Sequence, residues 1–180
     1  MNKKIGLALC LIFVIPIAGY LTVNEWKSGS SELDQSDEKT YDSPGFEKRM
    51  EYEVFVILNQ ERESRGIHSL ERNAILDSVA EAHSQDMAKK DYFNHINLDG
   101  QTPMDRVDET GKICKYVGEN LAYNSHESFT AQERMEGLMN SPSHRDNILD
   151  TDYVQVGLAV EKGEDSFYLT QVFCGLFKET

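Results

Sequence analysis

A strand pattern near the C-terminus sets the fold, and it reads Val154-Gln155-Val156-Gly157-Leu158-Ala159-Val160. The larger apolar side chains alternate with small or polar ones, which is typical of a strand that packs one face against a core. A turn follows at residues 162–165, and apolar side chains return through residues 167–177. This spacing predicts a β-hairpin, and the pattern of residues 116–123 predicts one further strand.

Helical patterns precede the hairpin. Four helices are predicted, at about residues 50–65, 73–90, 102–111 and 130–140. The first two carry apolar side chains at helical spacing, and the other two begin at the capping residues Thr102 and Thr130. Because the helices come first and the strands, mostly antiparallel, come last, we predict an α+β domain built in layers.

Composition restricts the function. The 180 residues are 27% charged and 39% hydrophobic, which suits a soluble globular body and excludes a polytopic membrane protein. The formal net charge is −13. Since nucleic-acid binding depends on basic side chains that replace counterions, this charge argues against a nucleic-acid partner.

The N-terminal segment has the pattern of a membrane anchor. Residues 5–23 carry no Asp, Glu, Lys, Arg or His, and as a helix they would reach about 28 Å, close to the thickness of a bilayer core. Lys3 and Lys4 favour a cytoplasmic location for residues 1–4, so the rest of the chain would lie outside the cytoplasm. The alternative is a cleaved signal and a secreted protein, although the stretch before Tyr20 is a poor cleavage site.

A spacer and one domain follow the predicted anchor. Residues 24–45 are acidic and polar with few large apolar side chains, which is typical of a flexible linker. Residues 46–180 are long enough for one domain that buries roughly two thirds of its chain surface on folding.

Three short segments stand out together: Tyr-Phe-Asn-His at 92–95, Val-Gly-Glu-Asn at 117–120, and Ser-Pro-Ser-His-Arg-Asp-Asn-Ile-Leu at 141–149. With the strand around Gly157 and residues 171–173, their order resembles the CAP superfamily (cysteine-rich secretory proteins, antigen 5, pathogenesis-related 1). The likeness is to the prokaryotic extracytoplasmic branch, with its SCP-like domain, and it covers nearly all of residues 50–177.

The resemblance implies a three-layer α-β-α sandwich with a small, mostly antiparallel sheet and a central cleft. Position by position, it implies that the cleft contains His95, Glu119 and His144, and we add Asn120 and Ser141 from the same motifs. A second family acid is absent, because its position is Ser141 here. Leu138 also replaces the family's Trp, and Ser143 replaces a common Gly. These departures weaken any mechanism that needs two acids.

The chemistry of the trio His95, Glu119 and His144 leaves two interpretations open. Two imidazoles and a carboxylate can hold one divalent, zinc-like ion with water at its open positions. Alternatively, the three side chains hydrogen-bond one another and brace the cleft without metal. The compact helical His pair of zinc peptidases is missing.

Other polar residues receive simpler interpretations. His83 lies at helical spacing with apolar residues, which favours a packed histidine over a ligand, whereas His68 and His126 lie in polar loops and are expected to be solvated. Arg106 and Arg145 are expected to pair with acids and hold loops around the cleft. No nucleophile elbow accompanies the serines beside His144, which argues against a serine hydrolase.

Cysteine positions fit an oxidising compartment. Cys10 belongs to the apolar N-terminal run, which leaves Cys114 and Cys174 outside the cytoplasm, where disulfides persist. We predict that these two pair; the alternative is two buried free thiols.

The expected function is a membrane-tethered extracytoplasmic module whose cleft binds a small apolar, lipid-like, peptide or envelope-polymer ligand, with or without a divalent ion. The alternative is a metal-dependent hydrolase, plausibly a peptidase, in which Glu119 acts as ligand or catalytic base. A third interpretation is an adhesion or scaffolding domain with no cleft function.

Overall fold

A computed structural model describes residues 45–125 and 130–177 of the protein. The predicted cytoplasmic tail, the membrane segment at 5–23 and nearly all of the linker lie outside these residues. Across the described ranges, no helix has both the length and the apolar character needed to cross a bilayer.

The described residues form an α+β fold. The elements are α1 (Phe46–Glu63), β1 (Glu71–Arg72), α2 (Ala74–Lys90), α3 (Pro103–Asp108), β2 (Tyr116–Ser125), α4 (Ala131–Asn140), α5 (Pro142–Leu149), β3 (Tyr153–Lys162) and β4 (Ser166–Gly175). The sheet has the order β1-β3-β4-β2, with β1 parallel to β3 and the other two pairings antiparallel. The predicted α+β class and the hairpin are confirmed, and the strand predicted at residues 116–123 is β2, which runs two residues further.

Side-chain caps explain where the helices begin. Asn73 accepts hydrogen bonds from two backbone N–H groups in the first turn of α2, and Thr130 accepts one from the N–H of Glu133 in α4. Thr102 and Asp105 form a reciprocal capping box at α3, with a proline in its first turn. The short helix α5 and the two-residue strand β1 were not predicted from the sequence pattern.

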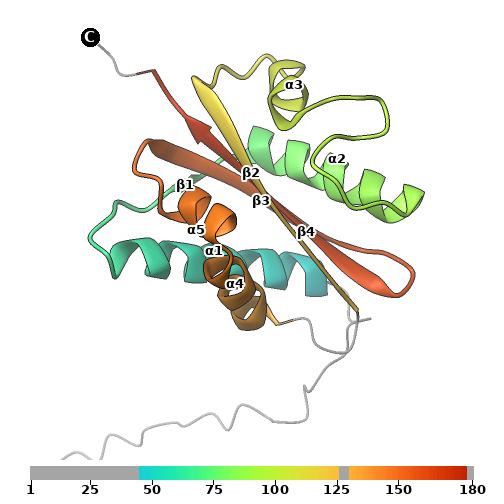
Figure 1. Cartoon of the computed structure of the whole chain (residues 1–180), viewed down its shortest axis with the longest axis horizontal. Coiled ribbons are helices and arrows are strands. Elements are labelled where there is room, and N and C mark those ends of the chain that lie inside the picture. Colours follow the sequence, from blue (N-terminus) through green and yellow to red (C-terminus); the bar gives the residue numbers. More distant parts are fainter. Residues whose placement is uncertain (1–44, 126–129, 178–180) are drawn as a thin grey trace, which may run out of the picture. The chain divides into compact units, whose positions relative to one another are not determined.

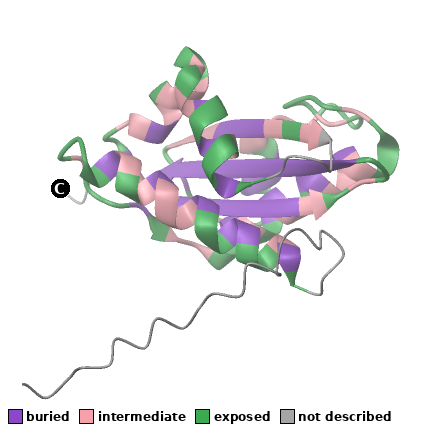
Figure 2. Ribbon diagram, turned by 90° about the horizontal axis from the view of Figure 1, so that it is seen from below, coloured by how far each residue is buried: buried purple, intermediate pink, exposed green. Residues whose placement is uncertain are grey.

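Helices cover both faces of the sheet. One apolar core joins α1, α4 and α5 to β3 and β4, and a second joins α2 and α3 to the opposite face (Figure 1). Burial is concentrated on the strands between these helices (Figure 2). Gly157 lies where α2 crosses β3, and a Cβ there would meet the backbone carbon of Leu76 at 2.0 Å. Only a glycine permits this close approach.

The predicted disulfide is confirmed. Cys114 and Cys174 are bonded, with their Cα atoms 5.5 Å apart and a sequence separation of 60. The bond joins the segment before β2 to the last residues of β4 on the face covered by α2 and α3.

Candidate functional site

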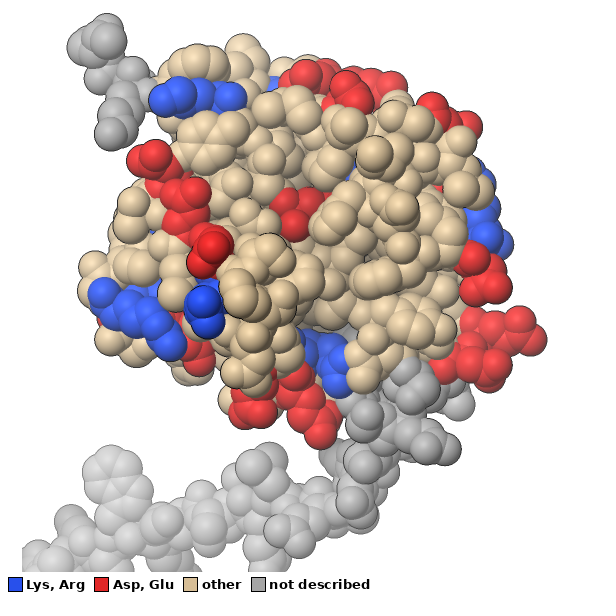
Figure 3. Space-filling model, in the orientation of Figure 1, with Lys and Arg blue, Asp and Glu red and all other residues tan. Residues whose placement is uncertain are grey.

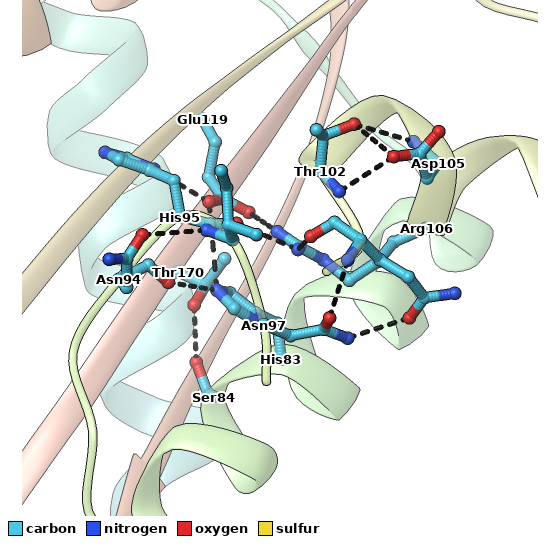
Figure 4. A network of polar contacts seen from close by, with 12 residues as sticks. His83, Ser84, Asn94, His95, Asn97, Thr102, Asp105, Arg106, Glu119 and Thr170 are labelled. Atoms are coloured by element: carbon cyan, nitrogen blue, oxygen red, sulfur yellow. Dashed lines mark hydrogen bonds and ion pairs between the residues drawn. The ribbon is translucent and has the colours of Figure 1, made fainter. Parts of the chain in front are cut away.

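A buried carboxylate on the edge strand β2 is the centre of the site. Val117 and Leu121 pack toward α2, and Glu119 lies between them on the same face of the strand. Arg106 Nη2 donates to Glu119 Oε2 at 2.6 Å, and His95 Nδ1 lies 2.8 Å from Oε1 (Figure 4). Since an ionised carboxylate is costly to bury alone, the guanidinium is what makes this position tenable.

Arg106 also positions the loop that carries His95. Its Nη1 donates to the backbone carbonyl oxygens of His95 at 2.9 Å and Gln101 at 3.0 Å. Within the loop, Asn97 Oδ1 accepts from the backbone N–H groups of Asp99 and Gln101, which makes a local turn. The predicted role of Arg106, pairing with an acid and holding a loop, is confirmed.

His83 belongs to this cluster, although its pattern predicted only a packed histidine. It is 1% exposed, its Nε2 lies 3.0 Å from the carbonyl oxygen of Asn94, and the same nitrogen lies 3.9 Å from Glu119 Oε1. Burial lowers the pKa of His83, and the charge of Glu119 partly opposes that effect. The feature of the sequence that could have placed His83 in the site is its position on the apolar side of α2. That side packs on the sheet and also faces Glu119.

His144, the second predicted histidine, lies on α5. The hydrogen bonds between α5 and β2 are made by backbone carbonyl groups and by the side-chain amides of asparagines. Asn120 Nδ2 donates to the carbonyl oxygen of His144 at 3.1 Å, and Asn147 Nδ2 donates to Asn120 Oδ1 at 2.9 Å. Ser141 precedes α5 and makes no side-chain cap there. Asn120 therefore joins α5 to the strand that carries Glu119.

The His144 ring forms no hydrogen bond to His95 or Glu119 within residues 45–125 and 130–177. Burial lowers the pKa of His144, and the charge of His95 lowers it further. The predicted trio is thus divided: His95 and Glu119 are in direct contact, and His144 interacts with His95 through charge.

The metal prediction does not fit this arrangement. In the part of the chain that the structure describes, no three His, Cys, Asp or Glu side chains are grouped so that they could hold a metal ion. Of the predicted trio, only His95 and Glu119 are in direct contact, and Arg106 pairs with the other oxygen of Glu119. A guanidinium beside the carboxylate also repels a cation.

Two smaller predictions also have outcomes. His68 was expected to be solvated, and it is exposed. Its Nε2 also lies 3.0 Å from the carbonyl oxygen of Tyr153, and its own carbonyl accepts from Arg62. His126 lies outside the described residues.

Charged side chains are unevenly distributed over the face of the protein that Figure 3 shows. Lys, Arg, Asp and Glu lie mainly around its margin, and acidic atoms are also visible near the centre of the otherwise tan region.

Comparison with known proteins identifies the family. The cysteine-rich secretory protein family (CAP) matches residues 57–175. Two proteins of Bacillus subtilis (strain 168) are similar: the uncharacterized protein YkwD, 34% identical over 137 residues, and the uncharacterized membrane protein YlbC, 32% identical over 123 residues. The alignments cover 76% and 68% of this chain, which spans 51% and 34% of those relatives.

A solved structure agrees with the sequence match. It is an extracellular protein containing a SCP domain from Bacillus anthracis, 28% identical, with a TM-score of 0.63 over 72% of this chain and 41% of the other. The chain therefore belongs to the cysteine-rich secretory protein (CAP) family and is of the bacterial extracellular kind.

Proposed function

We propose that the protein is a membrane-tethered extracytoplasmic binding module, and that it takes an apolar ligand beside His95 and Glu119. The tether rests on the apolar run at residues 5–23 and on a relative named a membrane protein. The ligand class rests on the surface around His95.

Apolar side chains flank His95 and are exposed. Phe93, Ile96 and Leu98 lie on its loop and Tyr123 lies on β2, and each is more than two fifths exposed. The rings of Phe93 and Tyr123 have centroids 5.7 Å apart, which joins the loop to the strand. Exposed apolar side chains that lie together beside a polar group are typical of a ligand surface. The contact between Phe93 and Tyr123, with the exposed Ile96 and Leu98 on the same loop, is the observation that carries the proposal.

Binding is better supported than hydrolysis. A catalytic base must reach the proton that it takes from the substrate. Glu119 is only 6% exposed, with Arg106 donating to one of its oxygens and His95 Nδ1 lying 2.8 Å from the other. The arrangement is that of a charge-paired, preorganised anchor at the edge of an apolar surface.

A matched pair of isoleucine variants tests the proposal. The full chain is titrated with a fluorescently labelled monoacylglycerol, a neutral apolar probe. Ile96 is 49% exposed beside His95, and Ile75 is 44% exposed at the start of α2. Ile96→Ser should weaken binding by about tenfold, since it removes apolar contact area, and Ile75→Ser should leave it unchanged.

Equal affinities in both variants, or no saturable binding by the full chain, would contradict the proposal. The hydrolase alternative is tested on the same preparation with a mixed peptide library, with and without chelator. Chelator-sensitive cleavage that is lost in Glu119→Gln would favour the hydrolase instead.

A further inference from the structure

The two edges of the sheet are finished differently. Strand β1 has only two residues, so most of β3 forms one edge and β2 forms the other. On the β3 edge, side chains take up the outward backbone groups. Leu158 N–H donates to Asp77 Oδ1 at 2.9 Å, and the carbonyl oxygen of Leu158 accepts from Arg72 Nη2 at 2.9 Å. Val160 N–H donates to Glu51 Oε1 at 3.4 Å. These positions are therefore closed to a further strand.

The same hydrogen bonds determine which backbone groups of β2 face outward. In antiparallel pairs, successive residues point their N–H and C=O groups alternately toward and away from the neighbouring strand. Leu158 points its groups away from β4, so its partner Gln171 points its own toward Asn120 of β2. Because the register of β2 on β4 is regular, Leu121 and Tyr123 point their groups away from β4, at the free edge.

The β2 edge is closed at Glu119 and open at Tyr123. Asn147 of α5 donates to the carbonyl oxygen of Glu119 at 3.2 Å, which agrees with the outward direction of that group. Further along, the outward N–H and C=O groups of Leu121 and Tyr123 have no hydrogen-bond partner within residues 45–125 and 130–177. Leu121 is buried, but Tyr123 is 47% exposed and its two neighbours on the strand are half-buried. An incoming chain can therefore reach the edge at Tyr123.

An open strand edge selects the chemistry of its partner. The main chain of an extended peptide offers N–H and C=O groups at the same two-residue repeat, and such edges are templates for strand addition. A peptide residue opposite Tyr123 places its side chain on the same face as the tyrosine ring. Phe93 also lies there, with its ring centroid 5.7 Å from that of Tyr123. Aromatic and β-branched side chains form favourable cross-strand pairs with an aromatic ring.

The surroundings of the edge favour a single peptide over a second folded copy. Asn147 of α5 approaches Glu119 from one side of the sheet, and His95 contacts its carboxylate on the other. A partner must therefore reach β2 between these two elements, which one extended segment does with the least bulk.

We propose that the Tyr123 end of β2 binds an extended peptide as an added strand, with an aromatic or β-branched side chain against Tyr123 and Phe93. The site shares these two rings with the apolar surface beside His95, so the proposal rests on the proposed function for its location. Main-chain pairing is what it adds, because it makes a peptide the ligand class.

N-methylated peptides test the pairing, because each methyl group removes one main-chain donor and leaves the side chains unchanged. The full chain is titrated with fluorescently labelled hexapeptides in which Thr alternates with Val, Ile or Phe. Each is also prepared with N-methyl groups on its three Thr residues or on its three apolar residues. A paired strand uses the N–H of every second residue, so one set should weaken binding by at least about tenfold and the other should leave it unchanged.

Two variants of Tyr123 separate its main chain from its ring. Tyr123→Val removes the ring and keeps the N–H, whereas Tyr123→Pro removes both. Proline is tolerated at an edge position whose N–H faces outward. Peptide binding should be at least about tenfold weaker in Tyr123→Pro than in Tyr123→Val. The unfolding midpoint of each variant shows whether a lost signal reports the edge or the loss of the fold.

Three outcomes would overturn the proposal. They are no saturable binding of any hexapeptide, equal weakening by both N-methylated sets, and self-association of the free chain that Tyr123→Pro abolishes, since the edge would then belong to a second copy. The monoacylglycerol titration keeps the two proposals apart. Peptide binding without monoacylglycerol binding would contradict the proposed function alone, and the reverse would contradict strand addition alone.

Discussion

Arg62 and Arg106 are both buried, on opposite faces of the sheet, and they are satisfied differently. Arg62 lies in the last turn of α1 and donates to four backbone carbonyl oxygens, at His68, Ile148, Asp150 and Tyr153. Arg106 lies on α3, pairs with the carboxylate of Glu119, and has one N–H, at Nε, with no partner among the described residues. The first arginine ties loops together, whereas the second organises a site.

The apolar cores of the two faces differ in the same way. The core beneath α1, α4 and α5 is one continuous cluster, but the opposite face has two smaller clusters. Buried polar groups lie on both faces: Glu51 and Arg62 belong to α1, whereas His83 and Ser84, which bonds to Thr170 at 2.7 Å, belong to α2. The disulfide and the Arg106–Glu119 ion pair are on the face covered by α2 and α3.

The largest expected effects on stability come from replacing the two buried arginines, and they should differ in size. Arg106→Met should lower the free energy of unfolding by about 3–5 kcal/mol, because it leaves the carboxylate of Glu119 buried without a counter-charge. Arg62→Met should lower the free energy of unfolding by less, about 1–3 kcal/mol. The groups that lose their hydrogen-bond donor in this variant are backbone carbonyls, which carry no net charge. Urea unfolding of the full chain measures both. Equal losses of unfolding free energy in the two variants would contradict the proposed difference between the two arginines.

Disulfide removal should affect the α2–α3 face selectively. Replacing Cys114 and Cys174 by serine opens a bond that spans 60 residues of sequence, and should lower the free energy of unfolding by about 2–4 kcal/mol. Amide hydrogen exchange should rise at β2 and α3 more than in α1. Uniform acceleration across both faces would show that the bond does not reinforce one face in particular.

Acid should destabilise the face that carries the cluster. The pKa values of His83 and His144 are lowered by burial. The unfolded chain therefore binds protons more readily, and stability that is fully present above about pH 6.5 is lost as the pH falls toward the folded-state values. Glu119, Arg106 and Asp86 surround His83 and act on the same titration.

Urea unfolding at about pH 5 and pH 7.5 measures this effect. His83→Gln should flatten the profile, because glutamine does not titrate. A wild-type profile that is flat, or that rises toward acid, would show that neither histidine is held neutral by the fold.

The smallest effect on stability is expected at His95. Its side chain is 49% exposed and Arg106 remains on Glu119, so His95→Ala should change the free energy of unfolding by less than about 1.5 kcal/mol. Monoacylglycerol affinity should nevertheless fall severalfold. Unchanged affinity would favour the scaffold interpretation, in which the cleft has no binding function.

Local rules explain what could be predicted from sequence. The caps at Thr102 and Thr130 and the period-two hairpin each depend on residues close together in the chain, and the disulfide followed from the only two cysteines outside the apolar run. The short helix α5 was missed because eight residues beginning with Pro142 carry little periodic signal.

Which residues make up the site could not be predicted in full, because tertiary contacts bring them together. Nothing local shows that Arg106 reaches Glu119 across 13 residues, or that His83 on α2 faces the same carboxylate. The expected metal ligands are not grouped among the described residues. The sequence places two histidines and an acid in family motifs, but the guanidinium that pairs with the acid comes from α3.

A double-mutant cycle of Arg106→Met and Glu119→Gln in urea unfolding tests the buried ion pair most directly. Because the pair is buried and in contact, we predict a coupling free energy of about 1.5–3 kcal/mol, so that Glu119→Gln costs much less in the Arg106→Met background. Losses that add within about 0.5 kcal/mol would contradict the account, since they would mean that the two side chains do not stabilise each other.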